Sequence, residues 1–92
     1  MYYMSKVELL DFSATWCGPC KMQKPHLEKV EAELAGQIDV KVVDVDQNQS
    51  LAAQYGIQAV PTLIILKDGE VAKRFTGLTT SGILLEELKK VL

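Results

Sequence analysis

The order of apolar runs and helical repeats along the chain limits what it can fold into. Residues 6–13 form a short apolar-rich run that predicts a buried strand, and the β-branched run at 40–45 predicts a second buried strand. Residues 17–35 lie between them and have the periodicity of a helix with one buried face. The positions that carry this periodicity are Leu27, Val30 and Leu34. The first half of the chain therefore predicts a strand–helix–strand unit.

The second half of the chain predicts a short helix followed by two strands. The short helix covers residues 50–55 and is ended by Gly56. The strands cover 62–66 and 71–76, and Asp68-Gly69 lies between them. Because this dipeptide is typical of two-residue hairpin turns, we expect the two strands to pair antiparallel.

The helix ends carry their own signals. We expect Pro25 to kink the first long helix and Gly36 to end it. A final helix is predicted to begin at Thr79 or Thr80, which would cap it, and to run to about Leu92. Its expected inward-facing residues are Ile83, Leu84, Leu88 and Val91.

The resulting order, β-α-β-α-β-β-α, predicts an α/β fold with a four-stranded mixed sheet and helices on both faces. Alternating strands and helices predict parallel pairs joined by right-handed crossovers, with an antiparallel hairpin at one edge. With 92 residues, the chain is expected to form a single domain over residues 1–92. The first helix starts where a strand ends, which is where open α/β sheets place their functional sites.

Composition narrows the class of protein further. The chain is 48% hydrophobic and 24% charged with a net charge of -2, as in ordinary globular proteins. We expect no membrane span and no nucleic-acid partner, since there is neither a long apolar run nor a basic balance. The segment from Met1 to Met4 lacks the pattern of a secretory signal, and Met4 is an alternative start. These features predict a cytoplasmic protein.

The two cysteines, Cys17 and Cys20, are separated only by Gly18 and Pro19. A bridge that closes so short a loop would stabilise the fold little, so a pairing would serve chemistry. At the start of a helix, Cys17 would be stabilised as a thiolate by free backbone N–H groups and the helix dipole. Cys17 would attack a substrate disulfide, and Cys20, one turn further in, would resolve the mixed disulfide.

Half of a zinc site is the alternative interpretation of the cysteine pair. Structural zinc needs four ligands, and His26 is the remaining candidate. Because His26 stands alone on a polar stretch, zinc binding would require a dimer. The sequence therefore favours redox chemistry and predicts no metal.

Asp11 is unusual because it lies in a strand whose other residues favour burial. Loss of hydration there should raise the pKa of its carboxyl group. One hypothesis is that Asp11 takes the proton of Cys20; the other is a structural aspartate held by hydrogen bonds. The strand pattern alone leaves both open.

The segment from Asp11 to Met22, which contains Trp16-Cys17-Gly18-Pro19-Cys20, resembles the active-site region of thioredoxins. Matching segments follow in the family's order and spacing from about Lys6 onward: Asp44-Val45-Asp46, Tyr55-Gly56-Ile57, Val60-Pro61-Thr62, Asp68-Gly69 and Gly77. The resemblance implies the thioredoxin fold. It also implies that Cys17 is the attacking thiol, Cys20 the resolving thiol and Asp11 the buried carboxylate that serves Cys20.

The same resemblance implies a substrate-binding surface around Cys17. Trp16 matches an aromatic residue that flanks the attacking sulfur, with Gly18 and Pro19 beside it in the same turn. Pro61 matches a cis-proline that would present the Val60 backbone to an extended substrate. Gly77 matches a loop glycine that lets the substrate approach closely. The implied substrate-binding residues are Trp16, Gly18, Pro19, Val60, Pro61 and Gly77.

The chain also departs from the family pattern. Ser13 stands where many thioredoxins have a second tryptophan, and the chain resembles a minimal version that starts almost at the strand with Asp11. Val42 stands where many members carry a lysine near the buried aspartate. Lys41 is one residue away and should point to the opposite face. Without that cation, the Asp11 carboxyl group should be harder to ionise.

The resemblance implies a monomeric reductase of protein disulfides whose Cys17–Cys20 disulfide needs no other cofactor. A separate thioredoxin reductase would supply the electrons. A glutaredoxin-like enzyme is disfavoured by Gly18-Pro19, and an oxidase or isomerase by Pro19, where such members tend to carry histidine. A binding module without turnover and a metal-binding dimer are the alternatives from other classes.

Overall fold

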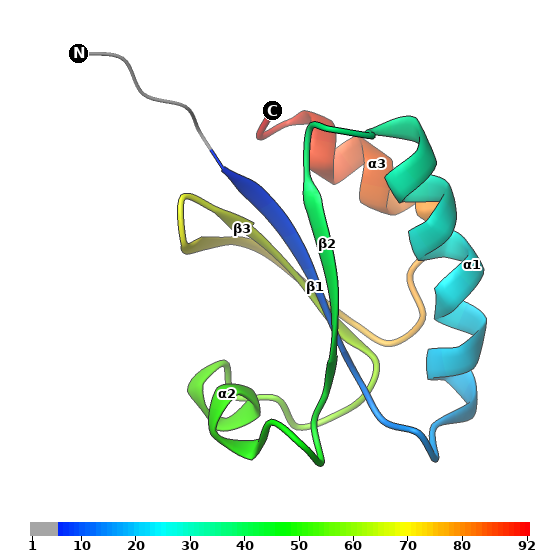
Figure 1. The fold of residues 1–92 in the computed structure, drawn as a ribbon, viewed down its shortest axis with the longest axis vertical. Helices are drawn as coiled ribbons and strands as arrows, with labels where there is room; N and C mark the ends of the chain where they lie inside the picture. Colours follow the sequence, from blue (N-terminus) through cyan, green and yellow to red (C-terminus); the bar gives the residue numbers. More distant parts are fainter. Residues whose placement is uncertain (1–5) are drawn as a thin grey trace.

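The computed structural model describes residues 6–92 and has the element order expected from the sequence (Figure 1). The question of whether the chain starts at Met1 or Met4 lies outside the described residues. The elements are β1 (Val7–Ser13), α1 (Gly18–Glu33), β2 (Asp39–Asp44), α2 (Gln49–Gln54), β3 (Thr62–Lys67), β4 (Glu70–Thr76) and α3 (Ser81–Lys89).

The strands form one sheet in the order β2-β1-β3-β4. The expected parallel pair is present between β1 and β2. The expectation of a second parallel pair is wrong, because β3 runs antiparallel to β1. The six-residue α2 is only about 9 Å long. It is too short to return the chain along a strand of about 20 Å, so β3 starts at the end of the sheet where β2 stops (Figure 1).

The hairpin between β3 and β4 is confirmed as antiparallel. Asp68 and Gly69 form its turn with φ angles of 52° and 86°. Two successive positive φ values are those of a type I′ turn, whose twist matches that of the flanking strands. The dipeptide therefore sets the turn as its sequence predicts.

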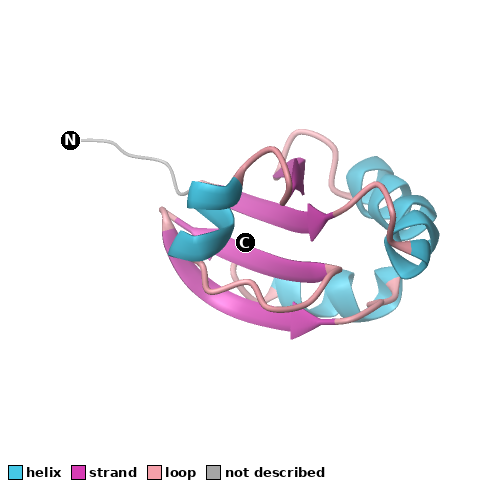
Figure 2. Cartoon of the chain, turned by 90° about the horizontal axis from the view of Figure 1, so that it is seen from below, coloured by secondary structure: helices cyan, strands magenta, loops and turns pink. Residues whose placement is uncertain are grey.

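The sheet has helices on both faces, as expected. Figure 2 shows α1 and α2 on opposite sides of the strands. The core between the sheet and helices α1 and α3 consists of Val7, Leu9, Leu27, Val30, Leu34, Leu63, Ile65, Leu84, Leu85 and Leu88. On the other face, residues of α2 and the loop after it pack on Leu10, Phe12, Ile64 and Leu66. Alternation along β1 thus directs Asp11 toward α1 and its neighbours Leu10 and Phe12 toward α2.

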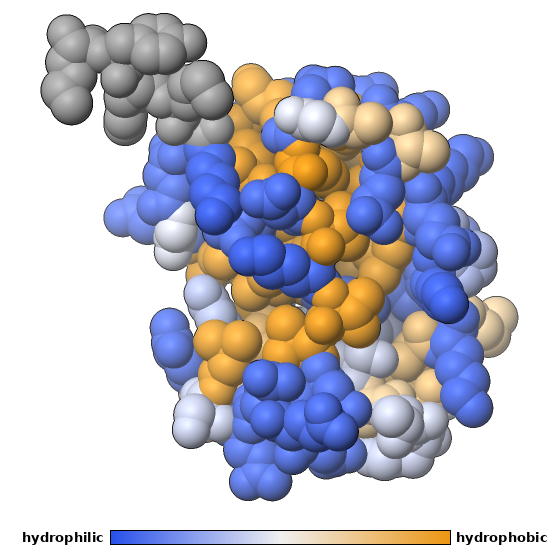
Figure 3. Space-filling view, viewed as in Figure 1, coloured by the Kyte–Doolittle hydropathy of each residue, from blue (hydrophilic) through white to orange (hydrophobic). Residues whose placement is uncertain are grey.

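The prediction that the second strand is buried is wrong. β2 is the edge strand beside β1, and its residues are exposed or half-buried. Val42 is 63% exposed. Figure 3 shows apolar side chains gathered in the middle of the molecular face that contains β2. A β-branched run predicts a strand, but it does not tell whether a neighbour lies on each side.

The last helix differs from its prediction in two respects. It begins after Thr80, whose side chain accepts a hydrogen bond from the Ile83 N–H, and it ends at Lys89 rather than about Leu92. Ile83 is exposed, whereas Leu85 is buried with the predicted Leu84 and Leu88. None of the helices formed by residues 6–92 combines the length and apolar character needed to cross a bilayer.

Candidate active site

The cysteine pair lies at the start of α1, as predicted from the helical periodicity of residues 17–35. Cys17 is the N-cap residue, and Pro19 is in the first turn of the helix. Cys17 and Cys20 are joined by a disulfide with their Cα atoms 5.3 Å apart. The backbone N–H of Cys20 donates a hydrogen bond to the Cys17 sulfur over 3.2 Å. In the reduced protein this N–H and the helix dipole favour a thiolate on Cys17.

Exposure does not distinguish the two cysteines. Cys17 is 5% exposed and Cys20 is 6% exposed, and both pack with Ala14. Their difference lies in the helix: only the Cys17 sulfur accepts a hydrogen bond from a first-turn N–H. The chemical asymmetry predicted for the pair therefore comes from backbone position.

Trp16 precedes the pair and is 69% exposed, so it is not a core residue. Its indole N–H donates a hydrogen bond to Oδ2 of Asp46 over 2.9 Å. Asp46 thus orients the exposed ring beside the cysteines, a role that the sequence analysis did not assign. The only signal was its place in the matching segment Asp44-Val45-Asp46, since 30 residues separate the two partners.

Two loops from the far half of the chain meet near the disulfide. The Val60–Pro61 peptide bond is cis, as the resemblance implies, and the Val60 carbonyl oxygen lies 3.7 Å from the Cys17 sulfur. The Gly77 N–H donates to the Pro61 carbonyl oxygen over 2.8 Å. Gly77 has a φ of +93° with open space beside its Cα. The structure therefore brings Val60, Pro61 and Gly77 together next to Cys17.

Gly18 contributes differently from Gly77. Its φ lies outside the positive range, so the backbone does not require glycine there, and open space surrounds its Cα. The predicted substrate-binding residues Gly18 and Pro19 thus lie on the exposed side of the helix start. A side chain at Gly18 would project into this space without meeting the protein itself.

Two polar residues of α1 contact the loop after β4 and the start of α3, and neither contact was predicted from the sequence. The Gln23 side chain is fully buried, and its amide exchanges two hydrogen bonds with the Thr79 backbone, at 2.7 and 2.8 Å. Nδ1 of His26 accepts from the Ser81 N–H over 3.0 Å. His26 is therefore part of a structural contact that also orients the Gly77 loop.

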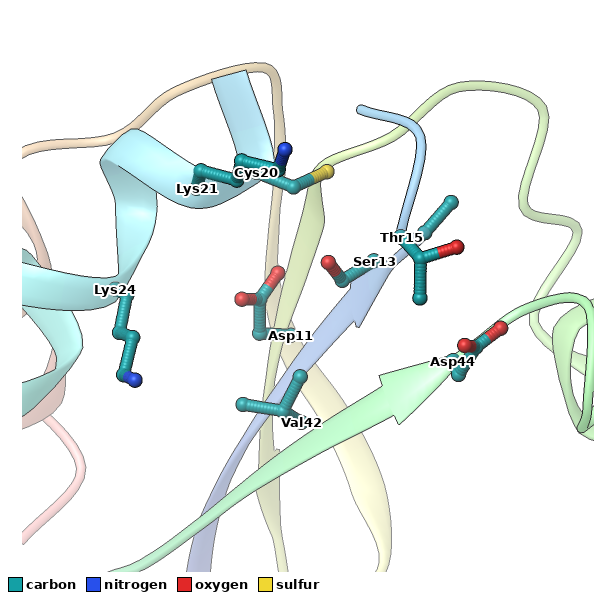
Figure 4. A pocket seen from close by; sticks show the side chains of 9 residues that line it. Asp11, Ser13, Thr15, Cys20, Lys21, Lys24, Val42 and Asp44 are labelled. Carbon is teal, nitrogen blue, oxygen red and sulfur yellow. The ribbon is translucent and has the colours of Figure 1, made fainter. Parts of the chain in front are cut away.

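Asp11 lies beneath Cys20 (Figure 4). It is 2% exposed, and its burial raises the pKa of its carboxyl group from 3.8 to about 6, as predicted. Within residues 6–92 its Oδ1 atom has no hydrogen-bond partner. The alternative hypothesis, a structural aspartate held by hydrogen bonds, therefore finds no support at Oδ1. Asp11 and Cys20 line the same cavity of about 500 Å³.

The neighbourhood of Asp11 agrees with the predicted departure from the family. Val42 is the direct neighbour of Asp11 across the β1–β2 pair. The adjacent Lys41 pairs instead with Glu8, its Nζ atom 2.9 Å from Oε2. Because Glu8 and Asp11 are three residues apart in a strand, they point to opposite faces. Lys41 is thus directed away from Asp11.

Across the described range, 6–92, no three His, Cys, Asp or Glu side chains lie close enough together to hold a metal ion. Cys17 and Cys20 are bonded to each other, and the His26 ring nitrogen Nδ1 already accepts a hydrogen bond. The Cys17–Cys20 disulfide and the buried Asp11 carboxyl group lie together at this site.

Comparisons with known proteins agree with this geometry. A sequence model of the thioredoxin family matches residues 3–90. Thioredoxin from Staphylococcus aureus is 47% identical over 86 residues, which cover 94% of this chain and 83% of that protein. Among solved structures, a thioredoxin-2 of a malaria parasite has a TM-score of 0.90 at 31% identity, covering 97% of this chain and 86% of that one. A mutant thioredoxin from Halobacterium salinarum has a TM-score of 0.85 at 38% identity, covering 94% and 74%.

These similarities extend over nearly the whole chain, and the range that the family model matches contains the positions of both cysteines. Thioredoxins are thiol–disulfide oxidoreductases that work by dithiol–disulfide exchange, and the Cys17–Cys20 disulfide is the group that such an exchange requires. The chain belongs to the thioredoxin family.

Proposed function

We propose that this protein reduces disulfide bonds of other proteins, with Cys17 as the attacking thiol and Cys20 as the resolving thiol. The observation that carries this assignment is the hydrogen bond from the Cys20 N–H to the Cys17 sulfur at the helix start. A thiolate forms more readily on the sulfur that has this donor. The sulfur one turn further into the helix remains available for the second step.

The reaction has two exchanges. The Cys17 thiolate attacks one sulfur of the substrate disulfide, and the other substrate sulfur leaves with the electron pair of the broken bond and takes a proton. The Cys20 thiolate then attacks the Cys17 sulfur of the mixed disulfide. The Cys17–Cys20 bond forms, and the second substrate sulfur leaves in turn. The substrate gains two electrons and two protons.

The substrate would bind on the surface around Cys17. Trp16 is held there by Asp46, and the Val60 carbonyl faces the Cys17 sulfur from the other side. An extended substrate segment would pair with the Val60 backbone in β fashion, which gives affinity without strong sequence preference. The open space at Gly18 and Gly77 would leave room for it. Pro61 and Pro19 complete the proposed binding set.

Asp11 would accept the proton of Cys20 during the second exchange. Its raised pKa of about 6 supports this role, because a base is most effective when its pKa lies near the working pH. Its position on the wall of the cavity that Cys20 also lines supports the same role.

The Cys17–Cys20 disulfide would be the only redox group that the reaction needs. A separate thioredoxin reductase would return two electrons to it after each cycle, and the protein would act as a monomer. We place it in the cytoplasm, because a dithiol reductant must work where thiols are kept reduced.

Insulin reduction by dithiothreitol, followed by the turbidity of the released chains, tests the proposal. We expect the Cys17→Ser variant to show only the uncatalysed rate, because a hydroxyl group cannot form the mixed disulfide. Cys20→Ser should instead accumulate a covalent adduct with insulin, visible by mass spectrometry without reductant.

Both variants need a control for folding. For this control, their thermal unfolding curves are compared with that of the reduced wild-type protein. A Cys17→Ser variant that is folded and as active as the wild type would refute the assignment. Wild-type protein that binds disulfide-containing proteins without reducing them would indicate a binding module instead.

A further inference from the structure

The cavity beneath the disulfide contains more charge than the proposed mechanism uses. Its lining comes from β1 and the loop that follows it, from the start of α1, and from β2 (Figure 4). The charged residues of this lining are Asp11, Lys21, Lys24 and Asp44. Oδ1 of Asp11 is buried there and is unpartnered among residues 6–92. A buried carboxylate without a partner is costly, so the ionised form of Asp11 calls for a cation.

Lys24 is better placed than Lys21 to supply this cation. Lys24 follows Cys20 by four residues in α1, so the two side chains lie on the same side of the helix. Lys21 follows Cys20 directly and is therefore rotated by about 100° from it. In Figure 4 the Lys24 side chain extends from α1 beside the cavity, with Asp11 across from it on β1. Its flexible four-carbon chain allows the ammonium group to move toward Asp11.

The other carboxylate of the lining, that of Asp44, has hydrogen-bond partners of its own. Oδ1 of Asp44 accepts hydrogen bonds from the N–H groups of Asp46 and Gln47, at 2.8 and 3.4 Å, which commit Asp44 to the turn after β2. From β2 itself the direct neighbour is Val42, and from β3 it is Leu63, neither of which carries a charge. In the part of the chain that the structure describes, no salt bridge involves Lys24. Its ammonium group is therefore not committed elsewhere.

We propose that Lys24 is a positioning residue for Asp11, whose ionised carboxylate pairs with the Lys24 ammonium group across the cavity. The pair holds Asp11 in the charged state in which it takes the Cys20 proton. The resulting Cys20 thiolate attacks Cys17 in the mixed disulfide, and the electron pair of the broken bond leaves with the substrate sulfur, which takes a proton from water. This inference rests on the proposed role of Asp11 in disulfide reduction.

A direct test is an NMR titration of the Asp11 carboxyl carbon in the reduced and in the oxidised protein. The Asp11 signal is assigned by its absence from Asp11→Asn. We expect Lys24→Met to raise the measured pKa of Asp11 by about one pH unit, because an opposite charge nearby favours the ionised form. Lys24→Arg keeps the charge and should largely restore the wild-type value.

Lys29→Met is the matched control, because Lys29 is an exposed lysine of the same helix outside the cavity. It should leave the Asp11 pKa unchanged. The proposal would be overturned if Lys24→Met left the pKa of Asp11 at its wild-type value. It would also be overturned if Lys24→Met and Lys29→Met raised this pKa equally, since only the net charge of the helix would then matter.

A kinetic measurement separates this proposal from the proposed function. The rate at which Cys20 resolves a preformed mixed disulfide should depend on pH. Lys24→Met should shift this pH–rate profile to higher pH by as much as it raises the pKa of Asp11. If the wild type reduces insulin but the pH–rate profile of Lys24→Met is unshifted, the proposed role of Lys24 is refuted and the proposed function is not. If the wild type does not reduce insulin, the proposed function fails, while the NMR titration still reports on the Lys24–Asp11 pair.

Discussion

Gln23 and Asp11 are both buried polar residues, yet their surroundings differ completely. The Gln23 side chain exchanges two hydrogen bonds with the Thr79 backbone. Oδ1 of Asp11 has no partner in the described part of the chain, and burial raises the pKa of its carboxyl group. A buried polar group with full hydrogen bonding stabilises a fold, whereas one without costs free energy.

We propose that this difference separates a structural residue, Gln23, from a functional one, Asp11. Gln23 lies on the helix face that packs inward and connects α1 to the loop that contains Gly77. Asp11 lies beside the cavity that also contains Cys20. Because an unpaired buried carboxylate is retained where it performs chemistry, its cost is evidence for a proton-transfer role. The comparison therefore predicts opposite effects on stability when the two side chains are replaced.

The largest effect is expected for Gln23→Leu. This change leaves the N–H and C=O groups of Thr79 buried without partners, at about 1–3 kcal/mol each. We expect the free energy of unfolding, measured in urea, to fall by about 3 kcal/mol. Gln54→Leu, at an exposed glutamine of α2, is the control and should change it by less than about 0.5 kcal/mol. A loss no larger than that of the control would remove Gln23 from its structural role.

The second effect has the opposite sign. The pKa of Asp11 is higher in the folded protein, about 6, than its ordinary value of 3.8. The folded state therefore binds this proton more tightly, and wild-type stability falls as the pH rises from about 4 to about 6. Asp11→Asn removes this loss and should raise the free energy of unfolding at pH 7.5 by up to about 3 kcal/mol.

The measurement is a series of urea unfolding curves between pH 4 and pH 8. The gain of Asp11→Asn over the wild type should grow with pH and level off above about pH 6. Asp39→Asn removes an exposed carboxylate at the start of β2 and should have little effect. Resolution of the mixed disulfide should slow in Asp11→Asn. A variant that is less stable than the wild type at every pH would identify Asp11 as a structural residue like Gln23.

The smallest effect is expected at His26, whose side chain makes one hydrogen bond, whereas the Gln23 amide makes two and Oδ1 of Asp11 makes none within residues 6–92. His26 is half-buried, and its Nδ1 accepts from the Ser81 N–H in the first turn of α3. His26→Leu should lower the free energy of unfolding by about 1 kcal/mol, because one helix-start N–H loses its acceptor. His26→Gln offers an amide oxygen instead and should recover part of this loss. If His26→Leu left the free energy of unfolding unchanged, water would replace His26 as the acceptor for the Ser81 N–H.

Much of the fold was predictable because its signals are local. The element order, the helix start at the cysteine pair and the hairpin turn at Asp68-Gly69 each depend on a few neighbouring residues. The burial of Asp11 was also predictable, since its strand is apolar on both sides. The resemblance to thioredoxins added the neighbours that Cys17 acquires from distant loops, among them Val60 and Gly77.

Other features depend on contacts between distant segments and had no local signal. The hydrogen bonds of Gln23 join residues 56 positions apart, and that of Trp16 to Asp46 joins residues 30 positions apart. The exposed edge of β2 depends on which strand lies beside it, which a β-branched run does not specify. The direction of β3 was predicted wrongly for the same reason. The sequence of residues 50–55 predicts a short helix, but it does not specify that this helix lies at the end of the sheet.

By itself, the sequence determined which segments become strands and helices and that two cysteines begin a helix, because these follow from spacing along one stretch of chain. Only the tertiary structure decided that Oδ1 of Asp11 finds no hydrogen-bond partner among residues 6–92, in a cavity with Cys20 and Lys24 on its walls. That outcome depends on the packing of α1 against β1 and β2, which sets the hydration and the neighbouring charges of Asp11. Those surroundings, rather than the identity of the residue, raise its pKa into the range that proton transfer requires.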